Sequence, residues 1–177
     1  MKKLILLITL LSQNLFAESL EKSENLAEDF NKTCYANSDK SSCNAKAMTY
    51  FTEAINTANV ALAKKLIADK ATFFTPVSKE PLFGGEGYIS VVNFMRQSFP
   101  DIQWEVKDMV LSDKVVAVYW LCTGTHSAGD FFGKKADNSK FSFSTMNFYY
   151  FDEEGKIIND IAGEGLAGML MDLGILK

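Results

Sequence analysis

The sequence predicts an α+β fold in which helices cover one side of a single antiparallel sheet. Apolar residues recur at helical spacing between residues 49 and 99, whereas residues 102–163 contain alternating, β-branched and aromatic runs. The chain has 177 residues, of which 47% are hydrophobic, and its 14 Phe can fill a substantial core. We therefore expect one folding unit, with helices first and antiparallel strands after them.

The helices of the first half are predicted from their apolar spacing. One series of apolar residues covers residues 51–58, and a second covers residues 60–67 after Asn59. A short strand is expected over residues 71–75. A glycine-rich loop over residues 84–87 then precedes a third amphipathic helix, which ends at Pro100.

The second half is predicted to form the sheet. Residues 102–107 alternate between apolar and polar side chains, and they should pair as a hairpin with the run 115–125. Further strands are expected over residues 141–151 and 156–163, joined by a turn. A last helix over residues 166–173 follows.

Alternation within these strands indicates which residues share a face. Trp120 and His126 fall on one face of the strand after residue 115, and Tyr119 falls on the other. Both faces are largely apolar, which favours a sheet with helices on one side and a subunit partner on the other. In the strand over residues 141–151 the apolar phase slips by one, and a bulge near Ser144 is the simplest explanation.

The first seventeen residues are typical of a secretory signal. Met1-Lys2-Lys3 is positive, residues 4–11 are mostly apolar, and Ala17 is a small residue at the expected cleavage site. A membrane anchor is the alternative, but so short an apolar run cannot cross a hydrocarbon core that needs about 20 residues. We expect export to the periplasm or the medium, with no stable membrane association after cleavage.

Export favours a disulfide between Cys34 and Cys43, which flank a polar stretch suited to a loop. A metal pair is the alternative, but it lacks further ligands because His126 is the only histidine. Cys122 lies in an apolar run, where a cysteine is more often a small buried residue than a nucleophile. The polar residues 18–48 form an N-terminal extension.

The charge balance argues against a nucleic-acid partner. The chain has 18 basic and 22 acidic residues and a formal net charge of −4, which becomes −6 if Lys2 and Lys3 are removed with the leader. Binding to phosphate polymers needs clustered Lys and Arg, and the sequence contains no such cluster.

Several short segments carry a family resemblance. They are Glu86-Gly87-Tyr88-Ile89, Ser98-Phe99-Pro100-Asp101, Gly124-Thr125-His126, Phe132-Gly133, Glu154-Gly155-Lys156-Ile157 and Leu173-Gly174. In order and spacing over residues 49–176, they resemble the SnoaL-like polyketide cyclase or ester cyclase family of the nuclear-transport-factor-2-like (NTF2-like) superfamily. The resemblance implies a cone in which helices pack on a curved antiparallel sheet around an apolar pocket, and a homodimer formed through the sheet. The chain then divides into a signal peptide (1–17), the extension (18–48) and an NTF2-like domain (49–177).

The resemblance also implies a type of chemistry. Cyclases of this group close a carbocycle by an aldol-type step without a metal or an organic cofactor. A pocket acid or base moves a proton at carbon, and nearby donors polarise the carbonyl. The ligand expected here is a small apolar carbonyl compound, bound by Trp120, Tyr119, Asn147, Tyr149 and Asp160.

The expected proton-transfer pair is His126 and Glu164. His126 occupies the family's His position, although a strand-end histidine that hydrogen-bonds a neighbouring loop is an equal alternative. The position usually held by Asp is Gly165 here, and the candidates to supply the carboxylate instead are the adjacent Glu164 and the earlier Asp160. A one-residue shift reverses side-chain direction in a strand. Asp160 could therefore be exposed instead, and Glu164 could only flank the last helix.

Three functions remain open from the sequence. The first is an exported, cofactor-free enzyme of the cyclase or isomerase type. The second is a binding module of the same fold that keeps the cavity but not the acid. The third is an interaction role, in which the sheet face mediates dimerisation and the extension meets a partner. The fold alone does not choose among them.

Overall fold

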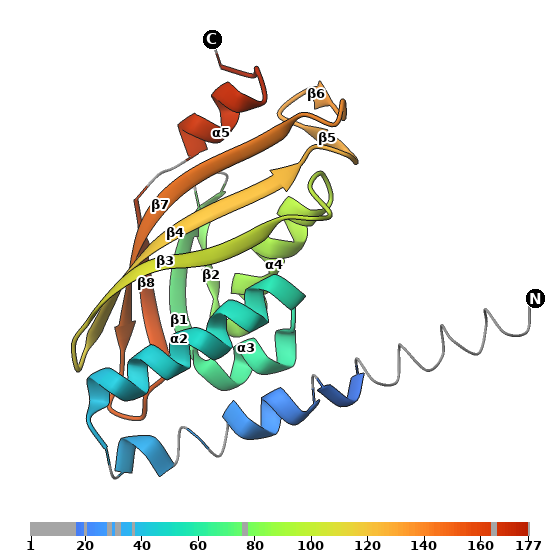
Figure 1. Ribbon diagram of the computed structural model, residues 1–177. Coiled ribbons are helices and arrows are strands. Elements are labelled where there is room, and N and C mark those ends of the chain that lie inside the picture. The colour runs from blue at the N-terminus through green and yellow to red at the C-terminus, as the bar shows by residue number, and fades with distance from the viewer. Residues whose placement is uncertain are drawn as a thin grey trace, which may run out of the picture.

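The computed structural model describes residues 17–19, 21–27, 30, 33–36, 38–75, 78–163 and 166–176 (Figure 1). The fold is α+β, as predicted, and its main feature is a curved six-stranded sheet in the order β2-β1-β8-β7-β4-β3. The strands are β1 (Ile67–Thr75), β2 (Ser78–Phe83), β3 (Gln103–Leu111), β4 (Val115–Thr125), β7 (Lys140–Phe151) and β8 (Ile157–Ala162). A separate two-stranded sheet consists of β5 (Asp130–Phe131) and β6 (Lys134–Lys135).

The helices are α2 (Lys40–Thr57), α3 (Val60–Leu66), α4 (Gly84–Arg96) and α5 (Leu166–Asp172). Figure 1 shows α2, α3 and α4 together on one side of the sheet. Among the residues described, no helix is both long enough and apolar enough to cross a bilayer. The leader expected over residues 1–17 lies outside the described residues except for Ala17, so it stays a prediction.

Two side-chain caps explain why α2 and α3 begin where they do. Asp39 accepts a hydrogen bond from the Ser42 backbone N–H at 3.1 Å, and Asn59 accepts one from the Leu62 N–H at 3.0 Å. Between the helices, Ala58 has a left-handed backbone (φ 52°) and ends α2. The expected pair of helices is therefore confirmed, although α2 begins earlier than the apolar series indicates.

Three segments differ from the prediction. Strand β1 begins at Ile67, a residue that the helical spacing had assigned to the preceding helix. Strand β2 was not expected because it contains Pro81; it lies at the edge of the sheet, where proline is tolerated. Residues 84–87 form the first turn of α4 rather than a loop. Gly85 is needed there, because a Cβ atom would lie 2.5 Å from the Ala63 backbone in α3.

The bulge predicted near Ser144 is wrong. Strands β4 and β7 pair without a register shift from Lys140 to Tyr150. Every second residue of β7 faces inward from Phe141 to Phe151, without an interruption. Met146 and Phe148 are apolar residues on the outward side, with exposed fractions of 48% and 41%. The irregularity lies in β8 instead. Two steps along β8, from Ile157 to Asn159, match one step along β7, so Ile158 is the extra residue.

The core has two parts. The larger cluster fills the space between the helices and the sheet, and the smaller one lies toward α5. Its members are Phe99, Ile102, Cys122, Phe131, Phe141, Met169 and Leu173. Cys122 is buried and free, as expected from its apolar surroundings, and burial raises the pKa of its thiol to about 12.

The opposite side of the sheet carries an exposed apolar row. Val110, Ala117, Phe148 and Ile161 are direct cross-strand neighbours on β3, β4, β7 and β8. Tyr119 and Met146 form a second pair beside them. We call these six residues the outer-face patch. Val110 is 70% exposed and Ile161 is 52% exposed.

The N-terminal extension is joined to the domain by the expected Cys34–Cys43 disulfide. Cys43 lies in the first turn of α2 rather than in a loop. The Tyr35 ring lies against Gly155, where a Cβ atom would come within 2.0 Å of it. Tyr35 also donates a hydrogen bond to Asn44, whose side chain donates to the Ser112 carbonyl at 2.8 Å. The extension is thus packed onto two turns of the sheet.

Candidate functional site

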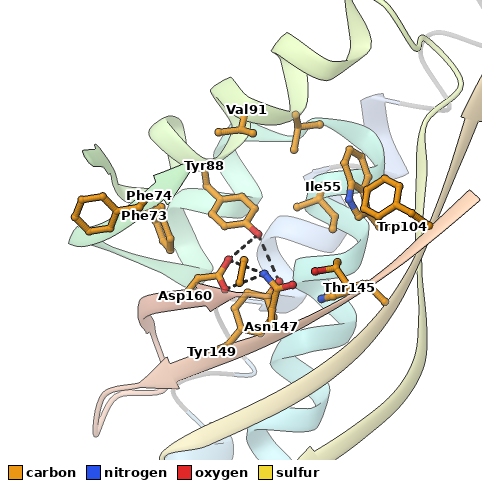
Figure 2. A pocket seen from close by; sticks show the side chains of 14 residues that line it. Ile55, Phe73, Phe74, Tyr88, Val91, Trp104, Thr145, Asn147, Tyr149 and Asp160 are labelled. Carbon is orange, nitrogen blue, oxygen red and sulfur yellow. Dashed lines mark hydrogen bonds between the residues drawn. The ribbon is translucent and has the colours of Figure 1, made fainter. Parts of the chain in front are cut away.

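A cavity of about 210 Å³ lies between the sheet and the helices (Figure 2). Its walls come from α2, α4 and five strands. The lining residues are Ile55, Phe73, Phe74, Tyr88, Val91, Val92, Trp104, Trp120, Phe143, Thr145, Asn147, Tyr149, Asp160 and Ala162. Phe74 is 67% exposed and stands at the rim. The cavity is therefore mostly apolar, with a few convergent polar groups, as is typical of small-molecule sites.

The Asp160 carboxylate reaches this cavity because of the bulge at Ile158. Ile157 is buried and faces inward opposite Phe151, so strict alternation would turn Asp160 outward. The extra residue shifts the phase by one. Asp160 becomes the cross-strand partner of inward-facing Tyr149, whereas Ile161 pairs with Phe148 on the outer face.

Two donors hold the Asp160 carboxylate. The side-chain amide of Asn147 donates to both of its oxygens, at 2.9 Å and 3.1 Å. The Tyr88 hydroxyl donates to Oδ2 at 3.2 Å and lies 3.4 Å from the Tyr149 hydroxyl. Figure 2 shows these four side chains converging from α4, β7 and β8. The carboxylate is thus fixed in direction by donors on two other elements, β7 and α4.

Burial changes the acidity of these groups. It raises the pKa of Asp160 to about 6, although the hydrogen bonds from Asn147 and Tyr88 favour the ionised form. Burial also raises the pKa of Tyr88 and of Tyr149 well above the ordinary value of 10.0, and the Asp160 charge adds to this effect. At neutral pH the cluster therefore combines a weakly basic carboxylate with two neutral hydroxyl groups.

Aromatic contacts fix the walls around the cluster. The Phe51 ring packs edge-on against Tyr88 and Tyr149, with centroids 5.0 Å and 5.1 Å away. Phe73 packs against the other side of Tyr88 at 4.8 Å. Trp120 stands edge-on to Tyr149 at 6.4 Å, and its buried indole nitrogen has no hydrogen-bond partner among the described residues.

Four of the residues expected to bind substrate come together here. Trp120, Asn147, Tyr149 and Asp160 all line the cavity, and Trp120 and Tyr149 are almost fully buried. Tyr119 does not join them. It is 42% exposed on the outer face, where it lines a shallow hollow with Met146 and Asp108.

The expected proton-transfer pair is not assembled at this cavity. His126 is fully buried beside the smaller core cluster, with its ring centroid 5.2 Å from that of Phe99, and its Nε2 lies 3.2 Å from the Gly129 carbonyl oxygen. It is not among the residues that line the cavity. Glu164 and Gly165 lie outside the described residues, so the role expected for Glu164 stays untested.

Two further signals for this site are present in the sequence. Tyr88 belongs to the Glu86-Gly87-Tyr88-Ile89 segment, which contributed only to the family resemblance although its hydroxyl contacts Asp160. Alternation along β3 places Trp104 on the inward face, and this residue also lines the cavity. Their role depends on the curvature of the sheet, which brings β3 and α4 to the same space.

The lining chemistry restricts what the cavity can bind. Asp160 is the one carboxylate among the described lining residues, and none of them is Lys, Arg, His or Cys. A single carboxylate is not a donor set for a metal ion. The arrangement can instead exchange a proton with a neutral, largely apolar molecule.

Comparisons with known proteins agree with this architecture. A family model described as SnoaL-like polyketide cyclase matches residues 45–173. The solved structure of IdmH, a proposed polyketide cyclase from Streptomyces antibioticus, is 25% identical, with a TM-score of 0.66 over 74% of this chain and 98% of that one.

Two more distant structures share the fold. AclR, a proposed hydroxylase from Streptomyces galilaeus, is 19% identical, with a TM-score of 0.65 over 77% of this chain and 99% of that one. A proposed SnoaL-like polyketide cyclase from Jannaschia sp. CCS1 is 13% identical, with a TM-score of 0.67 over 80% and 98%. No protein with a curated description matches the sequence.

Proposed function

The chain belongs to the SnoaL-like polyketide cyclase family, and from this premise we propose that it moves a proton at carbon in a small apolar carbonyl compound, without a cofactor. The reaction class is that of a cyclase or isomerase. One observation carries the proposal. Asp160 is directed into an apolar cavity and held there by Asn147 and Tyr88.

Asp160 has the properties of a general base. A base works best when its pKa lies near the working pH, and burial raises the pKa of Asp160 to about 6. Both carboxylate oxygens accept hydrogen bonds from Asn147, so the group is oriented before a ligand arrives. We therefore assign to Asp160 the role expected from the sequence for Glu164.

The proposed step transfers one proton between the ligand and Asp160. A C–H bond next to the ligand carbonyl breaks, and its proton forms an O–H bond on Asp160. The electron pair left on carbon becomes the C=C bond of an enolate, and the negative charge moves to oxygen. Return of the proton at another position gives an isomer. In the ring-closing branch, the enolate carbon forms a C–C bond to a second carbonyl carbon of the same molecule, and the alkoxide left on that carbonyl oxygen takes the proton back from Asp160.

Deuterium exchange tests the proposal without knowledge of the natural substrate. Acetophenone in D₂O should exchange its methyl hydrogens faster when the protein is present, as followed by proton NMR. Asp160→Asn keeps the shape of the side chain but removes the base. We expect it to slow the protein-dependent exchange by at least about 100-fold, the usual contribution of a positioned base.

The matched control is Asp108→Asn, because Asp108 lies in the hollow on the outer side of the same sheet. It should leave the exchange rate unchanged. The wild-type rate should rise with pH and reach half of its maximum near pH 6, where Asp160 ionises. Equal rates for wild type and Asp160→Asn would overturn the assignment of the base.

A binding module of the same fold is the second candidate. It is favoured by the tyrosines of the cluster, whose pKa values lie well above 10.0 and which therefore provide no second readily ionised group at neutral pH. In that case acetophenone would bind, but the protein would not accelerate exchange above the buffer rate.

We further propose that the protein is exported and acts as a homodimer. The Cys34–Cys43 disulfide supports export, since disulfides persist in oxidising compartments. Cell fractionation with non-reducing peptide mapping tests this, and free Cys34 and Cys43 thiols in the exported protein would contradict it. The outer-face patch supports the dimer, because contiguous exposed apolar surface marks an interaction site.

A further inference from the structure

The indole nitrogen of Trp120 is a buried polar atom of the cavity wall without a hydrogen-bond partner among the described residues. Trp120 is 2% exposed, and its Nε1 is buried without a hydrogen bond among the described residues. An indole N–H can only donate. A buried donor without a partner costs about 1–3 kcal/mol, so such groups call for an explanation.

The position of this N–H relates it to the Asp160 cluster. Trp120 lines the cavity beside Tyr149, with the two rings edge-on and their centroids 6.4 Å apart. Tyr149 is in turn beside Tyr88, whose hydroxyl contacts Asp160. A ligand in this cavity would therefore lie beside both the Trp120 indole and the Asp160 cluster.

The surroundings favour a neutral acceptor over an anion. No Lys, Arg or His is among the described lining residues, and Asp160 repels a second negative charge when it is ionised. An anionic ligand would therefore lose its hydration without gaining a cation. A ketone or ester oxygen needs only a hydrogen-bond donor.

The cavity volume limits the size of this ligand. About 210 Å³ is below the range of roughly 300–1,000 Å³ found for pockets that hold drug-sized molecules. The enclosed part of the ligand is therefore small. A molecule with several fused rings would extend past Phe74 at the rim.

Resting on the proposed function, we infer that Trp120 is the specificity-determining donor of this site: its Nε1–H binds the carbonyl oxygen of a small, neutral ketone or ester. The same contact holds the oxygen on which charge develops when Asp160 removes the proton. The cavity therefore selects a neutral carbonyl compound over a carboxylate of the same shape and over the matching hydrocarbon.

NMR of the indole N–H groups tests this directly, because the chain has only two tryptophans. The spectrum of Trp104→Phe assigns the remaining signal to Trp120. Three probes of similar shape are used at pH 8: acetophenone, ethylbenzene and benzoate. Acetophenone should move the Trp120 N–H signal downfield as the hydrogen bond forms. Ethylbenzene should not produce that downfield shift, and benzoate should bind at least about tenfold more weakly than acetophenone.

Matched variants separate the hydrogen bond from packing. Trp120→Phe should weaken acetophenone binding roughly three- to tenfold, the effect of one hydrogen bond, beyond any change in ethylbenzene binding. Trp104→Phe makes the same chemical change elsewhere in the cavity wall and should affect both probes alike. If Trp120→Phe does not fold, the wild-type and Trp104→Phe spectra still decide the question.

The inference is overturned if acetophenone binds without moving the Trp120 signal, or if benzoate binds as tightly as acetophenone. These results are independent of Asp160. Loss of exchange in Asp160→Asn together with an unmoved Trp120 signal would support Asp160 as the base and exclude Trp120 as the donor to the carbonyl oxygen. A downfield shift of the Trp120 signal without catalysed exchange would support Trp120 as the donor and identify the protein as a binding module without the proposed activity.

Discussion

Burial in the fold disfavours ionisation of the Asp160 carboxyl group, and hydrogen bonds from Asn147 and Tyr88 fix its orientation. Asn147 and Tyr88 favour its charged form, but burial has the larger effect and the pKa rises from 3.8 to about 6. The functional consequence is a base that is ready near neutral pH. The structural consequence is that ionisation of Asp160 costs folding free energy.

This cost predicts how stability depends on pH. Below pH 4 the carboxyl is protonated in both the folded and unfolded states. Between pH 4 and pH 6 the unfolded chain loses the proton first, so the contribution of Asp160 to stability falls as the pH rises through this window. Relative to wild type, Asp160→Asn should gain at most about 3 kcal/mol in unfolding free energy between pH 4 and pH 7.

Urea denaturation of both proteins at pH 4, 5, 6 and 7 measures this difference. The comparison removes the opposite contributions of carboxylates such as Asp137, whose pKa the side chains of Lys134 and Ser139 lower. A difference that is constant with pH would mean that Asp160 is solvated as in the unfolded chain.

At the residue scale, the sequence predicted some cavity residues and not others for a physical reason. Trp120, Asn147 and Tyr149 lie on β4 and β7, which pair without a register shift. Counting every second residue along these strands therefore identifies the side chains that face the cavity. The direction of Asp160 depends on an extra residue in β8, which no side-chain pattern revealed. By alternation His126 would share a face with Trp120, but it follows the end of β4 and is buried against Phe99, which belongs to the smaller core cluster.

At the scale of elements, the structure confirms the helices on one face and the strands predicted over residues 102–107, 115–125, 141–151 and 156–163. The period of the apolar residues in such segments is enough to distinguish a strand from a helix. β2 was missed because its sequence, Ser78–Phe83, has a proline and charged residues that an edge strand can accept. The parallel pairing of β1 with β8 joins segments distant in sequence, so no local pattern encodes it.

The Cys34–Cys43 bridge fixes the extension to the start of α2 and predicts a measurable loss of stability. The bridged residues are nine apart, and closing so short a loop restricts the unfolded chain by about 2–3 kcal/mol. Replacing both cysteines with serine should lower the unfolding free energy by about that amount, as measured by urea denaturation. Dithiothreitol should destabilise the wild type equally and leave the double variant unchanged. An effect of dithiothreitol on the double variant would point to another cause.

At the scale of the whole molecule, the outer-face patch predicts self-association. It extends over four strands and is composed of residues that the core does not use. A two-fold dimer would pair this face with its own copy. Phe148→Lys places a charge in the middle of the row and should raise the dimer dissociation constant at least about 30-fold, measured by sedimentation equilibrium.

Phe94→Lys on α4 is the matched control. Phe94 is 44% exposed, close to the 41% of Phe148, but it lies on a helix on the other side of the sheet. Its substitution should leave association unchanged. A wild-type protein that sediments as a monomer would refute the dimer, and acetophenone binding to Phe148→Lys tests that the cavity survives.

The bulge at Ile158 means that the local backbone of one strand decides the chemical character of the interior. If Ile158 were paired as an ordinary strand residue, the phase of β8 would turn Ile161 toward the cavity and Asp160 toward the outer surface. The cavity would then lose the one carboxylate among its described lining residues, and that charge would lie on the exposed side of the sheet. The hydrogen-bond register of a single strand, rather than the identity of any lining side chain, thus separates a site that can transfer a proton from one that can only hold a ligand.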